Sequence, residues 1–137
     1  MATRVLDASA LLAHLRDEPG AAVVSDAIAL GATIGTVNLA EVLGRVADRG
    51  GDPGRLVADL TERGLLAGAL TVEPFTVADA SEAARLRAAT RRAGLSLADC
   101  ACLALARRLE AVTLTADNAW NDLPLGVEVQ QIRSRTD

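Results

Sequence analysis

The sequence has no lysine and almost no aromatic residues, which limits the classes of site it can form and the side chains that can fill its core. All fourteen basic residues are arginine, and the chain has one Trp, one Phe and no Tyr. The missing lysine argues against a P-loop NTPase, whose lysine contacts the phosphates, and against a response-regulator receiver domain. Half of the 137 residues are hydrophobic, so the core of a single domain must be built from Leu, Val and Ala.

Histidine and cysteine are also scarce. His14 is the only histidine, which excludes most zinc sites, and we expect it to be a surface residue of the first helix. Cys100 and Cys102 are two residues apart in a predicted helix, so they point in different directions and do not form a C-x-x-C motif. We expect both to be small buried hydrophobic residues in a reducing cytoplasm.

Long apolar runs and an excess of basic charge are absent too. No segment is long enough to span a bilayer, and the N-terminus lacks the regions of a signal peptide. We therefore expect a cytoplasmic protein without a membrane partner. The net charge of -4 argues against a surface coated in positive charge for gripping long nucleic acid, but it allows a small acidic site that needs cations.

Strand-like and helix-like segments alternate along the chain. The expected strands lie at 5–6, 32–37, 70–72, 111–115 and 127–132, and the expected helices at 10–16, 21–30, 39–49, 56–63, 76–93 and 95–109. This alternation predicts an α/β fold, a three-layer α/β/α sandwich with a central, mostly parallel sheet of four to five strands. Because no repeat or linker divides the chain, we expect one domain over 1–132 and a polar tail over 133–137.

Particular residues mark the expected ends of the helices. Pro19 suits the first turn of the second helix, and Asn38 suits the cap of the third. Thr76-x-x-Asp79 and Ser96-x-x-Asp99 each have the spacing of a capping box.

Four carboxylates stand at places where a site would form. Asp7 and Asp117 directly follow apolar strands, and Glu41 and Asp99 lie three residues after potential helix caps. Parallel strands and right-handed crossovers bring such positions to one end of the sheet. Several acids gathered there would repel one another unless a hard cation lay between them, and Mg²⁺ and Mn²⁺ prefer oxygen ligands of this kind.

Each acid also has a purely structural interpretation. Asp7 and Asp117 can cap the helices that follow them, and Glu41 and Asp99 can close capping boxes. Taken one at a time, these roles are at least as common as catalysis. The joint order, spacing and neighbours of the four acids favour a shared site.

Four segments, in order, resemble those of the PIN-domain ribonucleases, specifically the VapC-type toxins of bacterial toxin–antitoxin pairs. The segments are VLDASALL at 5–12, TVNLAEV at 36–42, LSLADCACLALA at 95–106 and LTADNAW at 114–120. The third is the most specific, and together they cover nearly the whole chain. Ala8 stands where many relatives carry Thr, which leaves the acids intact.

The resemblance implies a function and a site. It implies an endoribonuclease that uses Mg²⁺ or Mn²⁺ to hydrolyse RNA phosphodiester bonds, leaving a 5′-phosphate and a 3′-hydroxyl. It also implies a homodimer silenced by a cognate VapB-type antitoxin. The implied catalytic and metal-binding residues are Asp7, Glu41, Asp99 and Asp117, with Ser9 and Thr115 as polar helpers. Asp122, near the fourth segment, is expected to be exposed to solvent and, at most, to act on the metal site from a remote shell.

Other classes fit the sequence less well. A phosphotransferase of the haloacid dehalogenase type needs a second Asp where Ser9 stands, and also a lysine. A dinucleotide-binding domain needs a G-x-G-x-x-G after the first strand. A PIN-like module that binds RNA or protein without cutting is the main alternative, and it ranks second because all four acids are present. The sequence leaves open which arginines contact RNA, because Arg85, Arg87, Arg91 and Arg92 also fit a solvated helix face.

Overall fold

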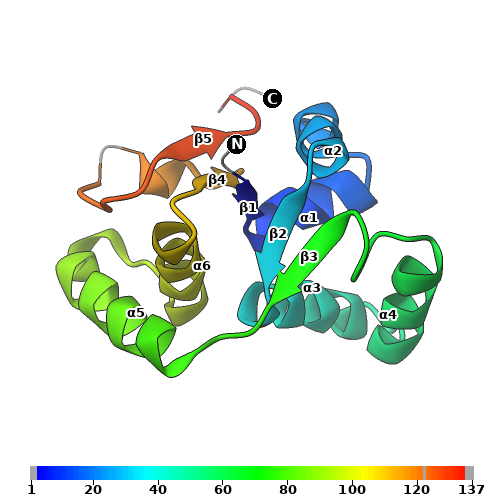
Figure 1. Ribbon diagram of the computed structural model, residues 1–137, viewed down its shortest axis with the longest axis horizontal. Helices are drawn as coiled ribbons and strands as arrows, with labels where there is room; N and C mark the ends of the chain where they lie inside the picture. Colours follow the sequence, from blue (N-terminus) through cyan, green and yellow to red (C-terminus); the bar gives the residue numbers. More distant parts are fainter. Residues whose placement is uncertain (1–2, 122, 135–137) are drawn as a thin grey trace.

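The computed structural model describes residues 3–121 and 123–134, and this part of the chain forms an alternating series of strands and helices (Figure 1). The strands are β1 (Arg4–Leu6), β2 (Ala32–Gly35), β3 (Leu70–Glu73), β4 (Val112–Thr115) and β5 (Val129–Gln131). The α-helices are α1 (Ala8–Leu15), α2 (Ala21–Ala29), α3 (Thr36–Asp48), α4 (Pro53–Glu62), α5 (Val77–Ala89) and α6 (Leu97–Arg108). Two short 3₁₀ turns are η1 (Arg91–Ala93) and η2 (Asn118–Trp120).

The strands pair in the order β3-β2-β1-β4-β5, and every pairing is parallel. The first strand in the sequence is therefore the central strand of the sheet. Leu6 aligns with Ile34 on one side and Leu114 on the other. The predicted α/β fold with a central sheet is confirmed, and the described sheet has five strands.

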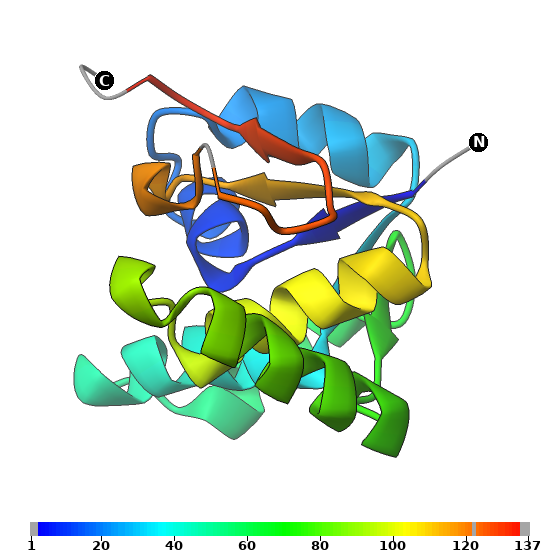
Figure 2. The ribbon, with the colours of Figure 1, turned by 90° about the vertical axis from the view of Figure 1, so that its left-hand side faces the viewer.

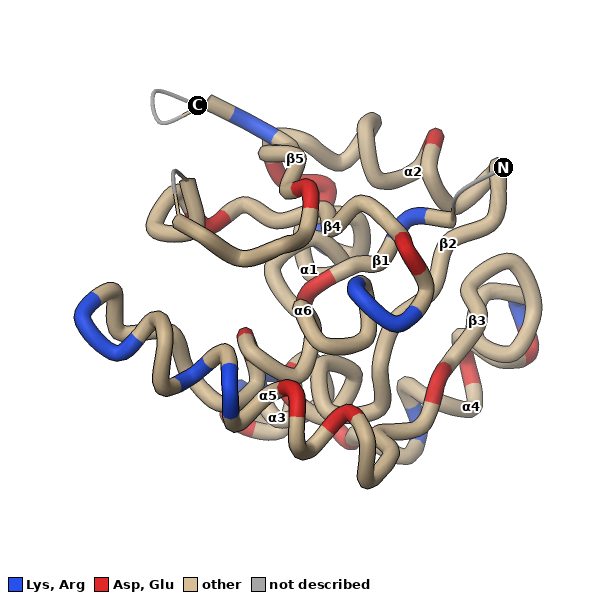
Figure 3. Tube along the Cα trace, turned by 60° about the vertical axis from the view of Figure 1, so that its left-hand side comes forward, with Lys and Arg blue, Asp and Glu red and all other residues tan. Residues whose placement is uncertain are grey.

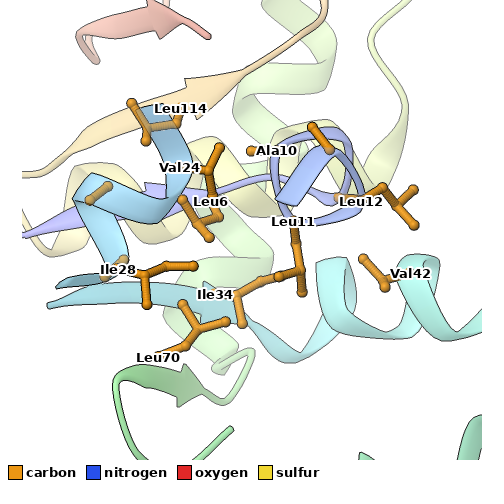
Figure 4. Close-up of a cluster of buried hydrophobic side chains, with 14 of the residues drawn as sticks. Leu6, Ala10, Leu11, Leu12, Val24, Ile28, Ile34, Val42, Leu70 and Leu114 are labelled. Carbon is orange, nitrogen blue, oxygen red and sulfur yellow. The ribbon is translucent and has the colours of Figure 1, made fainter. Parts of the chain in front are cut away.

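Alternation along β1 divides the core between the two faces of the sheet. Leu6 belongs to a cluster with side chains of α1, α2 and α3, whereas Val5 belongs to a cluster dominated by α6. Figure 4 shows the first cluster, with Leu11, Val24 and Ile34 converging on one side of the sheet. Figure 2 shows α2 on one side of the sheet and α5 and α6 on the other. This is the predicted three-layer sandwich.

The start of α3 differs from the prediction. The second strand ends at Gly35, which is the N-cap, and the helix begins at Thr36. The expectation that Asn38 caps this helix is therefore wrong. Its side chain is instead fully buried and donates hydrogen bonds away from the helix end, to Glu41 and to a carbonyl of α6. Tertiary contact thus overrides the local preference of Asn for a cap.

Two other helix boundaries also shift. Pro19 lies before α2 and not in its first turn as predicted: Gly20 is the N-cap, with a left-handed φ of 95°, and a Cβ at this position would lie 2.8 Å from Ile132. The predicted helix over 76–93 ends at Ala89, where the buried Thr90 hydroxyl donates to the Leu86 carbonyl at 2.8 Å. The η1 turn and Gly94, at φ 72°, complete the connection to α6. The capping boxes at the starts of α5 and α6 are both formed, as predicted.

The cysteines behave as predicted. Cys100 and Cys102 are free and buried within α6. His14 is half-buried, with Nδ1 3.0 Å from the Ser25 Oγ of α2, so it contacts the second helix rather than only solvent. Within the described ranges, no helix combines the length and apolarity needed to cross a membrane. Residues 135–137 of the predicted polar tail lie outside the described part.

Candidate active site at the carboxyl ends of the strands

Asp7 occupies the junction between the central strand and α1. It directly follows β1, and its backbone N–H donates to the Leu114 carbonyl at 3.2 Å, which extends the β1–β4 pairing by one residue. Its side chain is only 5% exposed. The apolar run Val5-Leu6 thus places a carboxylate at the carboxyl end of the sheet, where ligands bind in folds of this type.

The Asp7 carboxylate is held by three hydrogen bonds. Oδ1 accepts from the Ser9 hydroxyl at 2.7 Å and from the Ala10 N–H at 2.8 Å, so Asp7 is also the N-cap of α1. Oδ2 accepts from the Thr115 hydroxyl at 2.5 Å. The structural and the catalytic interpretations of Asp7 are therefore compatible, because a cap bond uses only one of its oxygens.

The pKa of Asp7 is raised from 3.8 to about 6, and burial is the largest cause. The hydrogen bonds from Thr115, Ser9 and the Ala10 N–H lower it, because they favour the charged form, and the nearby negative charge of Asp99 raises it. On balance, the folded protein disfavours the negative charge of Asp7.

Glu41 lies in the second turn of α3, half-buried. Asn38 Nδ2 donates to Glu41 Oε1 and to the Ala98 carbonyl of α6, both at 3.1 Å. Burial raises the pKa of Glu41, the Asn38 hydrogen bond lowers it, the Asp99 charge raises it and the Arg45 charge lowers it. Asn38 therefore joins the second acid to the helix that carries the third.

Asp99 closes the capping box of α6. Its Oδ2 accepts from the Ser96 N–H at 3.0 Å, and its own N–H donates to Ser96 Oγ at 3.0 Å. It is half-buried, and its charge raises the pKa of both Asp7 and Glu41. Burial, followed by the charges of Asp7, Asp99 and Glu41, raises the pKa of the Cys102 thiol well above its usual range. The pKa of this one buried thiol is thus raised by the charges of three of the four predicted acids.

Asp117 lies at the edge of this group. Its side chain is exposed and caps η2, with Oδ1 accepting from the Ala119 N–H at 2.9 Å. Its backbone N–H donates to Thr115 Oγ1 at 3.0 Å, and the same hydroxyl donates to Asp7. The fourth acid is thus linked to the first through one hydroxyl. Asp122 lies outside the described residues.

The structure brings Asp99 within electrostatic reach of both Asp7 and Glu41, and it links Asp117 to Asp7 through Thr115. Ser9 and Thr115, the predicted helpers, both contact Asp7. Four carboxylates offer hard oxygen donors, and their mutual repulsion favours a divalent cation. As the side chains stand, no group of three acids, histidines or cysteines within 3–121 and 123–134 is arranged to hold a metal ion. The carboxylate oxygens are therefore suitable ligands for a metal ion, and in this structure they accept hydrogen bonds from their neighbours.

Asn38 is the site residue that its sequence context did not reveal. A helix cap and a site-positioning amide both appear as an Asn three residues before an acid. Its burial of all but 1% of its surface distinguishes them, because a cap is normally near solvent. That information comes only from the fold.

Comparison with solved structures shows the same fold in several chains of low sequence identity. A chain of the DNA-bound VapBC from Salmonella typhimurium matches with a TM-score of 0.71 and 18% identity, covering 97% of this chain and 100% of that one. FitAcB from Neisseria gonorrhoeae gives 0.72 and 20%, covering 95% and 98%. A toxin–antitoxin complex from Klebsiella pneumoniae gives 0.72 and 16%, covering 96% and 99%.

Comparison with curated protein sequences gives no match. The family model for the PIN domain matches residues 4–125, which include β1 through η2 and all four predicted acids. The fold, the place of the carboxylates and this match agree, and the chain belongs to the PIN domain family.

Proposed function

We propose that this chain is a metal-dependent endoribonuclease, the toxin of a toxin–antitoxin pair. The observation that carries the proposal is the group of Asp7, Glu41 and Asp99 at the carboxyl ends of the parallel strands, where the charge of Asp99 helps to raise the pKa of both Asp7 and Glu41. Such a group is costly for a fold to maintain. A role in binding a cation explains why it is present in this one.

The proposed cofactor is Mg²⁺ or Mn²⁺, held by Asp7, Glu41, Asp99 and Asp117. A bound ion of this kind supplies Lewis-acid polarisation of a phosphate oxygen and lowers the pKa of a coordinated water. The sequence implied this ligand set through the family resemblance, and the carboxylate group described above supports it.

The chain's own side chains prepare the acids for this task. The hydroxyls of Ser9 and Thr115 donate to opposite oxygens of Asp7, which fixes the plane of the carboxylate and favours its charged form. Asn38 orients Glu41 toward the first turn of α6. The Ser96 N–H holds Asp99. Each acid is thus oriented by a donor from its own or a neighbouring element.

We propose a cognate VapB-type antitoxin as the partner and a homodimer as the assembly, acting on RNA in the cytoplasm. The similar solved structures include two VapBC complexes and a toxin–antitoxin complex, which supports the partner. A small gene beside this one should encode a protein that co-purifies with the chain and blocks cleavage. A gene neighbourhood without such a partner, with the chain fully active in its host, would remove the antitoxin proposal but leave the nuclease proposal.

The experiment that tests the activity is cleavage of bulk RNA with the ends mapped. The wild type should cut with Mg²⁺ or Mn²⁺, leave 5′-phosphates and stop in chelator. Asp7→Asn should be inactive yet folded, because Asn keeps the α1 cap while being a poor ligand for a hard cation. RNA binding without metal-dependent cleavage in the wild type would favour the non-catalytic PIN-like module instead.

A further inference from the structure

A groove of about 690 Å³ lies between the C-terminal half of α5, the η1 turn and the start of α6. Its lining includes Arg87 of α5 and Arg91 of η1, together with Ser96 and Leu97 at the start of α6. Ser96 is also the capping partner of Asp99. The groove therefore adjoins the acidic site through a shared residue.

The arginines of α5, η1 and α6 that concern this groove divide into two kinds. Arg85 and Arg107 both pair with Glu82 at 2.6 Å, and Arg108 pairs with Asp79 at 2.9 Å. Arg87 and Arg91, the two that line the groove, have no ion pair or side-chain hydrogen bond with any residue in 3–121 or 123–134. Figure 3 shows basic residues spaced along α5 and the turn after it. Their charge is available to a ligand.

We propose that this groove binds the phosphates of the RNA strand as it enters the acidic site, with Arg87 and Arg91 as the phosphate contacts. The inference rests on the proposed ribonuclease function and names part of its substrate-binding surface. Arginine suits this role, because its planar fork matches phosphate oxygens and it is always charged. Phosphate contacts position a strand without reading its sequence.

An RNA strand fits the groove better than an acidic protein segment does. The chain carries a net charge of -4, and the scissile region must lie against carboxylates. A polyanion reaches such a site only if cations hold its flanking phosphates, and the unpaired Arg87 and Arg91 line a groove that adjoins the site. The half-exposed Leu97 at the groove wall adds apolar surface for a base.

The test measures RNA binding apart from cleavage. A short fluorescein-labelled oligouridylate is titrated with protein in chelator, and fluorescence anisotropy gives the dissociation constant at several salt concentrations. A homopolymer is adequate, because phosphate contacts are independent of sequence. The variant is Arg87→Gln/Arg91→Gln. The matched control is Arg55→Gln/Arg63→Gln on and just after α4, which removes the same two charges on the opposite side of the molecule (Figure 1).

The groove variant should bind roughly 20-fold more weakly at about 0.1 M salt, and its salt slope should fall by about 0.7 for each lost contact. The control should stay close to the wild type, and both variants should keep the wild-type melting temperature. Equal affinities for the two variants, with cleavage of RNA intact in the wild type, would overturn the groove while leaving the nuclease. Weaker binding only in the groove variant, with no cleavage by the wild type, would support the groove and contradict the nuclease.

Two further outcomes of this experiment would also contradict the proposed groove. If the wild type binds no RNA in chelator, the groove is contradicted, and the separate cleavage assay with Mg²⁺ or Mn²⁺ decides the nuclease. If the RNA affinity of the groove variant is unchanged but a poly-glutamate peptide binds the wild type and not that variant, the groove is a protein-docking site, and the phosphate proposal is wrong.

Discussion

The first turns of α5 and α6 carry the same motif but do different things. Thr76-x-x-Asp79 and Ser96-x-x-Asp99 both form complete capping boxes with nearly equal hydrogen bonds. Asp79 is 3% exposed and accepts two hydrogen bonds from Arg108, at 2.9 and 3.1 Å. Asp99 has no such partner among the described residues, and it lies near Asp7 and Glu41 instead.

The charged groups near each capping box determine the role of its aspartate. Burial acts to raise the pKa of Asp79, but the hydrogen bonds from Arg108 and Thr76 outweigh it, and the net pKa is lowered. The negative charge of Asp99, in contrast, adds to a group that is already acidic. A local motif therefore identifies a helix start, and only the tertiary neighbours show whether its acid is structural or available for a metal.

The largest expected difference between the boxes is in RNA cleavage. Asp99→Asn should lower the rate by at least about 100-fold, because loss of mere outer-shell partners of a metal already costs about 10–100-fold. Asp79→Asn should cut at nearly the wild-type rate at a temperature where it is folded. The measurement is initial rate with Mg²⁺ or Mn²⁺. A comparison in which Asp79→Asn is the inactive variant and Asp99→Asn is active would reverse the assignment.

The next effect is the response of stability to pH through Asp7. Its pKa of about 6 in the folded protein exceeds the ordinary 3.8, so the folded state holds a proton that the unfolded state releases between these values. The metal-free protein should therefore lose roughly 3 kcal/mol of stability as the pH rises from below 4 through 6. Asp7→Asn should remove that loss. Urea unfolding in chelator at several pH values measures it.

The same titration separates the two boxes. Asp99→Asn should lower the pKa of Asp7, since the Asp99 charge helps to raise it, whereas Asp79→Asn should leave it unchanged. The carboxyl resonance of Asp7, followed by NMR in the metal-free protein, reports this directly. An Asp7 pKa that responds equally to both variants would show that Asp99 has no special place beside it.

A smaller effect is expected on stability from the Asp79–Arg108 pair. Asp79→Asn should cost about 1–3 kcal/mol, below the range for fully buried pairs, because the Arg108 side chain is 34% exposed. Since the Asp79 pKa is lowered, its contribution is present above the ordinary carboxyl pKa and is lost as the pH falls through the lowered value. Wild type and variant should therefore converge in stability in acid. Parallel stability curves down to low pH would contradict the pairing.

The smallest effect is the one on which the boxes should agree. Thr76→Ala and Ser96→Ala each remove one cap hydroxyl and should each cost about 1 kcal/mol. Denaturant melts of both variants measure the two losses. A loss at Thr76 without one at Ser96 would mean that the α6 box does not form in solution.

Much of the fold follows from local pattern in the sequence. The apolar runs at β1, β2 and β4 and the cap residues Thr76, Ser96 and Asp117 give the order and nearly the bounds of most elements. The start of α3 does not follow, because Asn38 is used in a contact sixty residues away along the chain. Residues that make long-range contacts lose the local preferences on which such predictions rest.

The acids of the site could be identified from the sequence, but their states could not. Asp7 directly follows an apolar strand that can be recognised in the sequence. Its raised pKa, however, depends on burial by elements that come much later in the chain. Asn38, Arg87 and Arg91 take their significance from what lies opposite them in space. Their catalytic or binding roles remain predictions for the experiments above.

The central position of β1 also sets when the site can come into being. The hydroxyl that holds Asp7 belongs to Thr115, 108 residues further along the chain. The middle of the sheet closes only when β4 pairs with β1, a contact of high sequence separation. During synthesis Asp7 is made early, but its partner Thr115 is added only when nearly the whole chain has been made. The proposed nuclease site is therefore assembled only after β4 has been made.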